Sequence, residues 1–206
     1  MVHLYEIGKL NPCPISGYEL STIIDNTSFM FTSEQKIAAM EERISDLIDE
    51  YEKHYRGKTS PPRILITGCP FDGVRDKIIK ELEEQGANVV AFENCSGPRT
   101  QRDLVDESID PYRALAKRYL GIGCSVMSPN PRRYEAIDEM IQEYQIDGVV
   151  EIVLNCCHTY AVESYSVKEM VQKKHNLPFL SLTTDFSTAY SGQLVTRIGA
   201  FLETLQ

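Results

Sequence analysis

Residues 148–154 read Gly-Val-Val-Glu-Ile-Val-Leu, and this short, almost wholly apolar run ends in Asn155-Cys-Cys-His158. An apolar run of this length, bounded by polar and turn residues, is typical of a strand that is buried on both faces of a parallel sheet. Three more runs of the same kind occur, at residues 63–67, 88–92 and 178–182. The sequence therefore predicts four buried strands.

Amphipathic segments with helical spacing alternate with these runs. They cover residues 72–85, 112–120, 132–144, 162–175 and 193–205. Strands that alternate with helices of this length imply βαβ units, whose crossovers are right-handed. The expected fold class is α/β, with a doubly wound, flavodoxin- or Rossmann-like four-stranded parallel sheet.

An amino-terminal helical extension precedes the sheet. Residues 14–30 and 32–55 show apolar side chains at helical spacing, and Thr32 with Gln35 resembles a capping box. Residues 58–62, Lys-Thr-Ser-Pro-Pro, are typical of a linker. We therefore predict a helical extension or joining segment over residues 1–60 and an α/β domain over residues 61–206.

Composition narrows the class of partner. The 206 residues are 42% apolar and 25% charged, with a formal net charge of −9. So acidic a chain is unsuited to nucleic acid or anionic membranes as main partners. Residues 1–9 lack the features of a signal peptide, and no apolar run approaches the roughly 18 residues that span a bilayer. We expect a cytoplasmic protein whose thiols stay reduced.

Cysteines follow three of the four predicted strands. They are Cys69 after the first, Cys95 after the second, and Cys156 with Cys157 after the third, while Cys124 lies in a Gly- and Pro-rich loop. Ligands of open parallel sheets bind beyond the carboxyl ends of the strands, so these thiols should share one edge. Converging thiolates suit zinc or an iron–sulfur cluster. The alternative is that each thiol is a small buried apolar group, which we expect for Cys13.

Six stretches carry a resemblance to a known family. They are Asn11-Pro-Cys-Pro-Ile-Ser-Gly17, Gly68-Cys-Pro70, Phe92-Glu-Asn-Cys-Ser-Gly97, Cys124-Ser-Val-Met-Ser-Pro129, Cys157-His-Thr-Tyr-Ala-Val-Glu-Ser164 and Gly192-Gln-Leu-Val-Thr-Arg-Ile-Gly-Ala-Phe-Leu-Glu203. At these stretches the chain resembles the 2-hydroxyacyl-CoA dehydratase family (2-hydroxyglutaryl-CoA dehydratase, D-component), with the closest likeness to the carboxyl-terminal half of its double-cubane-cluster branch.

The resemblance implies an iron–sulfur cofactor, either a 4Fe-4S cluster or a double-cubane cluster. Carried over by position, Cys157 is the first candidate ligand, Cys95 and Cys124 come next, and Cys156 and Cys69 rank lower. The resemblance also implies low-potential electron transfer to an acyl-CoA or another small substrate, with an ATP-dependent iron–sulfur activator. The enzyme would be a lyase of the 2-hydroxyacyl-CoA dehydratase type or an ATP-dependent reductase.

Two departures from the family pattern matter. Family chains are about twice this long, so a missing amino-terminal domain or a partner subunit would supply the remaining ligands. A homodimer of this chain is also a possible assembly. Val126 also stands where the double-cubane branch tends to have a cysteine. We therefore expect the isolated chain to be inactive, with a cluster that is incomplete or absent without its partner.

Two other interpretations stay open. The chain could be a cluster-free binding or interaction domain that keeps the fold, or a domain with zinc or ordinary thiol-redox chemistry.

Overall fold

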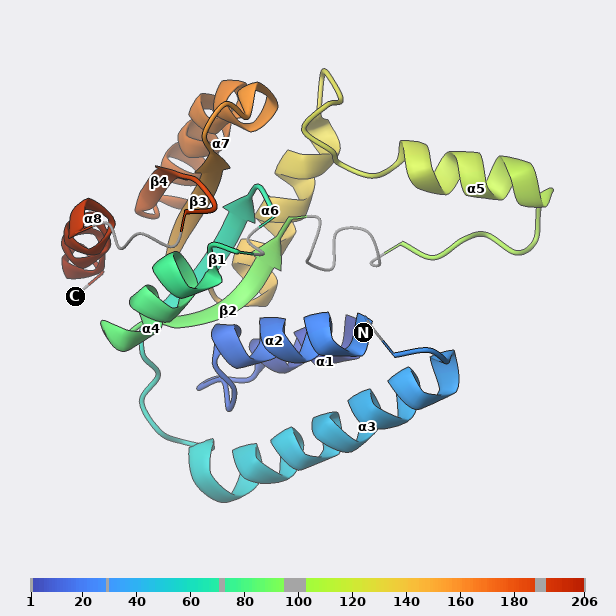
Figure 1. The fold of residues 1–206 in the computed structure, drawn as a ribbon, viewed down its shortest axis with the longest axis horizontal. Helices are drawn as coiled ribbons and strands as arrows, with labels where there is room; N and C mark the ends of the chain where they lie inside the picture. Colours follow the sequence, from blue (N-terminus) through green and yellow to red (C-terminus); the bar gives the residue numbers. More distant parts are fainter. Residues whose placement is uncertain (1, 29, 71–72, 95–102, 188–191, 206) are drawn as a thin grey trace.

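The computed structural model describes residues 2–28, 30–70, 73–94, 103–187 and 192–205. Its centre is a sheet of four parallel strands in the order β2-β1-β3-β4 (Figure 1). The strands are β1 (Arg63–Gly68), β2 (Asn88–Glu93), β3 (Gly148–Leu154) and β4 (Phe179–Thr184). The predicted fold class and all four predicted strands are confirmed.

Helices cover both faces of the sheet. On one face, α6 (Pro131–Glu143) packs on β1 and β2, and α7 (His158–His175) packs on β3 and β4. On the other, η3 (Asp76–Lys80) and α4 (Glu81–Glu84) follow β1, and α4 contacts α8 (Gly192–Glu203). The buried side chains of both layers meet the strands in one continuous core.

One helix stands apart from these layers. The segment after residue 102 and helix α5 (Pro111–Leu120) extend away from the sheet (Figure 1). Within α5 only Ala114 is buried, and the large side chains of Tyr112 and Tyr119 are exposed.

The amino-terminal segment packs along the outer strand β2. It comprises α1 (Val2–Glu6), η1 (Ile7–Lys9), α2 (Gly17–Ser28), α3 (Ser33–Glu50) and the π-helical turn η2 (Tyr51–Tyr55). Helix α2 and η1 both contact β2, which is an outer strand of the sheet. They therefore cover an edge that could otherwise pair with another chain. The predicted cap is confirmed, because the Thr32 side chain accepts a hydrogen bond from the backbone N–H of Gln35.

Arg63 joins this segment to the sheet. Its buried guanidinium donates to the carbonyl oxygens of Gly8, Leu10 and Tyr144, at 2.5, 3.0 and 2.8 Å. The predicted division at residue 60 stays a prediction, although side chains from both sides of it share one core.

Two helix starts differ from prediction. Helix α7 begins at His158 rather than at residue 162, and the helical segment after β1 begins near residue 76 rather than 72. The early start of α7 depends on the turn at Cys156 and Cys157, which apolar spacing does not reveal. Among the described helices, none combines the length and the apolarity needed to cross a bilayer.

Candidate functional site

The chain turns sharply at the carboxyl end of β1. Gly68 has φ +104°, and a Cβ placed there would lie 2.2 Å from the carbonyl oxygen of Ile152. The next residue, Cys69, is 1% exposed, and its Sγ accepts a hydrogen bond from the backbone N–H of Leu154 at 3.3 Å. Burial raises the pKa of the Cys69 thiol to about 12. Cys69 is therefore a buried thiol that is hydrogen-bonded within the sheet.

The turn after β3 separates its two cysteines. Cys156 is exposed and has a left-handed backbone, with φ +67°, while Cys157 is half-buried and occupies the N-cap position of α7. Cys157 also packs against the small apolar cluster that contains Cys69 and Tyr160. The two neighbouring thiols thus have different surroundings. Of the two, the Cys157 thiol is the one that lies beside the backbone N–H groups at the start of α7.

The surroundings of Cys157 stabilise a thiolate. Burial acts to raise the pKa of the Cys157 thiol, but the nearby backbone N–H of Tyr160, the Thr159 hydroxyl and the Cys69 thiol bring this pKa below its ordinary value. The Cys157 side chain makes no capping hydrogen bond within the described part of α7. The Thr159 oxygen lies 3.6 Å from the Cys157 Sγ. A thiolate at a helix N-terminus is the usual form of a reactive or metal-binding cysteine.

The loop that carries Cys124 contacts the same end of α7. The Ser125 hydroxyl donates to the Thr159 hydroxyl oxygen at 3.3 Å, and the Cys124 side chain is half-buried. This places the Cys124 loop beside the helix start that Cys157 caps. Cys95, the other candidate of the same rank, lies outside the described residues.

Cys13 lies apart from this edge. It is buried in the amino-terminal segment, where its thiol donates to the carbonyl oxygen of Ile15 at 3.2 Å, and burial raises its pKa to about 11. Across the ranges that the structure describes, no group of three or more His, Cys, Asp or Glu side chains is arranged to hold a metal ion.

A row of polar side chains crosses the sheet near the carboxyl ends of the strands. Thr67 of β1 is paired with Glu93 of β2 on one side and with Glu151 of β3 on the other, and Glu151 is paired with Ser181 of β4. The two glutamates are at most 1% exposed, and the Thr67 hydroxyl donates to Glu93 at 2.5 Å. Burial raises the pKa of Glu151, which accepts from the hydroxyls of Ser164 and Ser181.

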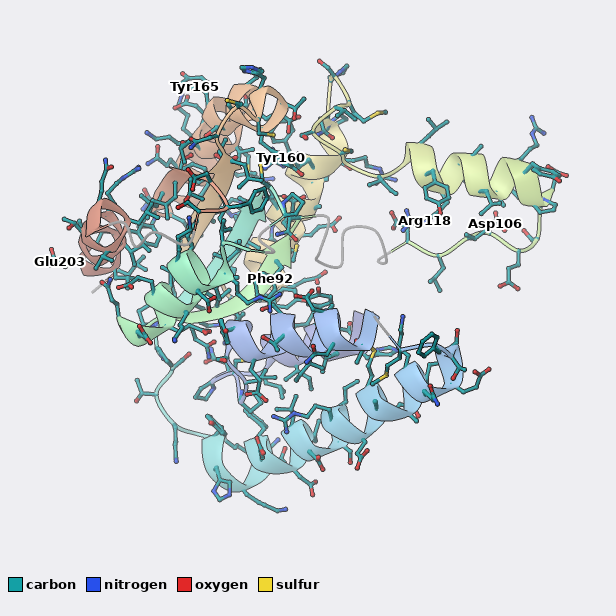
Figure 2. All side chains as sticks on the ribbon, viewed as in Figure 1. Phe92, Asp106, Arg118, Tyr160, Tyr165 and Glu203 are labelled. Carbon is teal, nitrogen blue, oxygen red and sulfur yellow. The ribbon has the colours of Figure 1, made fainter. Side chains whose placement is uncertain are left out.

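Arg133 of α6 inserts its guanidinium among these side chains. Arg133 is 0% exposed, and its nitrogens lie 3.3 Å from Glu93, 3.4 Å from Glu151 and 2.6 Å from Glu163 of α7. Its guanidinium carbon is also 4.8 Å from the ring centre of Tyr160, which is labelled in Figure 2. One buried cation thus faces three carboxylates, and the Coulomb attraction raises the pKa of Arg133 against the effect of its burial.

Asn130 connects this network to the Cys124 loop. Its side-chain NH₂ donates to the Cys124 carbonyl oxygen at 3.0 Å and to Glu163 Oε1 at 2.8 Å, while Glu163 Oε2 accepts from Arg133. Asn130 is 5% exposed. The backbone of the Cys124 loop is therefore tied to α7 through buried side chains.

Sequence reasoning missed this buried network. One signal was available, since Arg133 lies in phase with the apolar stripe of its helix, and Glu151 interrupts the apolar run of β3. The stripe consists of Ile137, Met140, Ile141 and Tyr144. A charged side chain that is buried on an apolar face needs a partner of opposite charge.

Comparison with known proteins gives a family match over residues 1–205, to the 2-hydroxyglutaryl-CoA dehydratase, D-component family. A protein of Escherichia coli K12 named as a dehydratase subunit, YjiM, is 42% identical over 205 residues, which cover 100% of this chain and 53% of that protein.

Two other relatives are more distant. The beta subunit of the (R)-phenyllactyl-CoA dehydratase of Clostridium sporogenes is 28% identical, covering 80% of this chain and 43% of its own. A subunit of the benzoyl-CoA reductase of Thauera aromatica is 25% identical, covering 90% and 45%.

The chain therefore spans about half the length of the curated relatives it matches. The family match covers residues 1–205, and the 42% identity extends over the whole chain. This chain belongs to the 2-hydroxyglutaryl-CoA dehydratase D-component family.

Proposed function

We propose that this chain forms one wall of an iron–sulfur site in a 2-hydroxyacyl-CoA dehydratase-type enzyme. The observation that carries the proposal is the Cys157 thiol at the N-cap position of α7, with the Cys124 loop held against the same helix end by the hydrogen bond from Ser125 to Thr159. The family match supports it, since two relatives are named as subunits of an acyl-CoA dehydratase and of a benzoyl-CoA reductase.

The surroundings of Cys157 support its role as a ligand in this proposal. Cys157 is partly exposed and is surrounded by donors that stabilise a thiolate, which is the form that ligates iron. Cys157, Cys95 and Cys124 are the proposed ligands. Cys69 and Cys156 are less suited, since Cys69 is buried within the sheet and Cys156 is an exposed residue with left-handed backbone.

A cluster bound here would supply single electrons at low potential to an acyl-CoA or another small substrate. The residues of this chain would hold the thiolates in place, donate hydrogen bonds to their sulfur atoms and exclude water from the buried side of the site. These contacts are the means by which a protein adjusts the potential of its cluster.

Further parts complete the proposal. The relatives are about twice as long as this chain, so we place the remaining ligands and the substrate pocket in a second domain or a partner subunit. An ATP-dependent iron–sulfur activator would deliver the electron. The isolated chain would then bind iron weakly and would be inactive.

Anaerobic iron and sulfide analysis tests this proposal. Reconstituted protein, with any co-purifying partner, should contain iron and sulfide in nearly equal amounts. Cys157→Ser should lose most of the iron, whereas Cys156→Ser, which changes the neighbouring exposed thiol, should keep it.

Three outcomes would count against the proposal. Unchanged iron in Cys157→Ser would remove the central ligand assignment. A colourless, metal-free protein would favour a cluster-free interaction domain, and zinc without sulfide would favour a zinc site.

A further inference from the structure

We propose that Asn130 and Glu163 form a clamp that sets the position of Cys124 relative to Cys157. Neither side chain is a candidate ligand, and both act through the backbone of the loop. The inference rests on the proposed function, in which both thiols are ligands, and the contacts themselves are independent of any bound cluster.

The first half of the clamp is a chain of three hydrogen bonds. The Cys124 carbonyl accepts from Asn130 at 3.0 Å, the same NH₂ group donates to Glu163 Oε1 at 2.8 Å, and Glu163 Oε2 accepts from Arg133 at 2.6 Å. Because Glu163 belongs to α7, whose first turn follows Cys157, this chain joins the backbone of one candidate ligand to the helix of the other.

A second contact restrains the same loop on its other side. The hydroxyl of Ser125, directly after Cys124, donates to Thr159 at 3.3 Å, and Thr159 in turn lies 3.6 Å from the Cys157 Sγ. Two hydrogen-bonded routes therefore connect the two thiol-bearing segments. A segment held at two points has much less freedom to rotate than a segment held at one.

The loop also comes unusually close to the start of α6. A Cβ at Gly123 would lie 2.7 Å from the backbone nitrogen of Arg133, so only a glycine permits this approach. The side chains of the clamp are deeply placed, with Asn130 5% exposed and the Glu163 side chain 11% exposed. In such surroundings hydrogen bonds are not exchanged for bonds to water, and their geometry is fixed.

The charge on Glu163 is essential to the arrangement. One carboxylate oxygen accepts from Asn130 and the other from Arg133, so both oxygens must be acceptors. A glutamine has only one acceptor, and its NH₂ group would face a donor. Glu163→Gln therefore breaks one link while keeping the size and shape of the side chain.

The clamp predicts an effect on metal affinity that does not need an active enzyme. Cd²⁺, which prefers thiolates, is titrated into the reduced 206-residue chain, and binding is followed by the thiolate-to-metal charge-transfer absorption. Asn130→Ala and Glu163→Gln should each weaken Cd²⁺ binding by about tenfold or more, as is usual when a group that orients a ligand is removed.

Asn11→Ala is the matched control. The Asn11 NH₂ group also donates to a side-chain oxygen, that of Gln145, at 2.8 Å, but it lies in the amino-terminal segment away from the cysteine edge. Its Cd²⁺ affinity should equal that of the wild type. Cys124→Ser and Cys157→Ser are titrated in parallel, to show whether these thiols bind the metal at all.

The alkylation rate of Cys124, followed by mass spectrometry, is a second readout that needs no metal. Asn130→Ala should accelerate it severalfold, with the rate at Cys156 unchanged. A loss of stability alone would also accelerate the alkylation of Cys13, which is buried in the amino-terminal segment, so the ratio of the Cys124 rate to the Cys13 rate separates positioning from general loosening.

The outcomes separate the clamp from the proposed function. If both cysteine variants weaken Cd²⁺ binding but Asn130→Ala and Glu163→Gln keep wild-type affinity, the clamp is wrong and the ligand assignment stands. If neither cysteine variant changes binding, the ligand assignment is wrong, and the Cys124 alkylation rate alone decides the clamp. An unchanged rate ratio in Asn130→Ala would then overturn it.

Discussion

At the scale of single residues, the most consequential side chain is a buried cation. Arg133 is enclosed by Glu93, Glu151 and Glu163 beneath the ends of the strands. A buried ion pair contributes little net stability when it is complete, but the loss of one partner leaves an uncompensated charge in the interior. Here the loss of the single cation would leave three carboxylates close together.

We therefore expect Arg133→Met to lower the free energy of unfolding by about 3–5 kcal/mol. The neighbouring Arg132 is the control, because its side chain is 64% exposed and, among the described residues, is paired with Glu135 on the same helix. Arg132→Met should change stability by about 0.5 kcal/mol or less. Urea unfolding measures the stability of both variants. Similar losses in the two variants would show that the three buried carboxylates do not need Arg133 as a counter-charge.

Glu151 gives a prediction of pH dependence. Burial raises its pKa, so the folded state holds its proton to a higher pH than the unfolded state does. The contribution of this group to stability is therefore complete below the unfolded pKa and is lost as the pH rises through the folded pKa.

Glutamine mimics the protonated carboxyl and does not lose a proton. The free energy of unfolding of Glu151→Gln, relative to the wild type, should therefore rise between about pH 4 and about pH 8. Urea unfolding at several pH values measures the difference. A constant difference across this range, or one that falls, would contradict the raised pKa.

At the scale of elements, the ends of the strands are controlled by close backbone approaches. Gly68 ends β1 with φ +104°, and it lies against the carbonyl of Ile152 in β3. This approach permits Cys69 to turn inward, where its amide donates to the same carbonyl at 2.8 Å. The geometry of the whole carboxyl edge depends on this turn.

Gly68→Ala should lower the free energy of unfolding by about 3 kcal/mol, because the added Cβ meets backbone atoms and the left-handed conformation is strained. Gly86→Ala separates the steric clash from the backbone strain. Gly86 has a similar φ of +96° but no atom within 4 Å of a built Cβ, so it should lose only about 1–2 kcal/mol. Equal losses in thermal or urea unfolding would show that the approach to Ile152 relaxes easily.

At the scale of the whole molecule, the amino-terminal segment and the sheet are joined by one core. Leu4, Tyr5 and Leu20 are buried together with Val89 and Phe92 of β2. Arg63 adds three hydrogen bonds across the same boundary. Each part would expose a large apolar surface without the other.

We therefore expect the chain to unfold in a single transition. The loss of far-ultraviolet circular dichroism should coincide with the loss of hydrogen-exchange protection in both α2 and β2 across a urea series. An earlier loss in α2 than in β2 would mean that residues 1–60 form a separately stable unit.

The sequence by itself determined the four strands and the fold class. Apolar runs of strand length cannot stay exposed, and their alternation with amphipathic helices leaves a parallel sheet as the simplest way to bury both. The cysteines after the strands predicted an edge rich in thiols, because parallel strands end together. The structure places Cys69, Cys157 and the Cys124 loop at that edge, and Cys95 lies outside the described residues.

Only the tertiary structure decided how the thiols differ. Cys156 and Cys157 are neighbours in sequence, but the left-handed turn between β3 and α7 exposes Cys156 and places Cys157 at the N-cap position of the helix. The network of Arg133, Glu163 and Asn130 likewise joins residues far apart in the chain. Spacing along a sequence cannot reveal such contacts, because burial and partners are set by which faces of the helices meet the sheet.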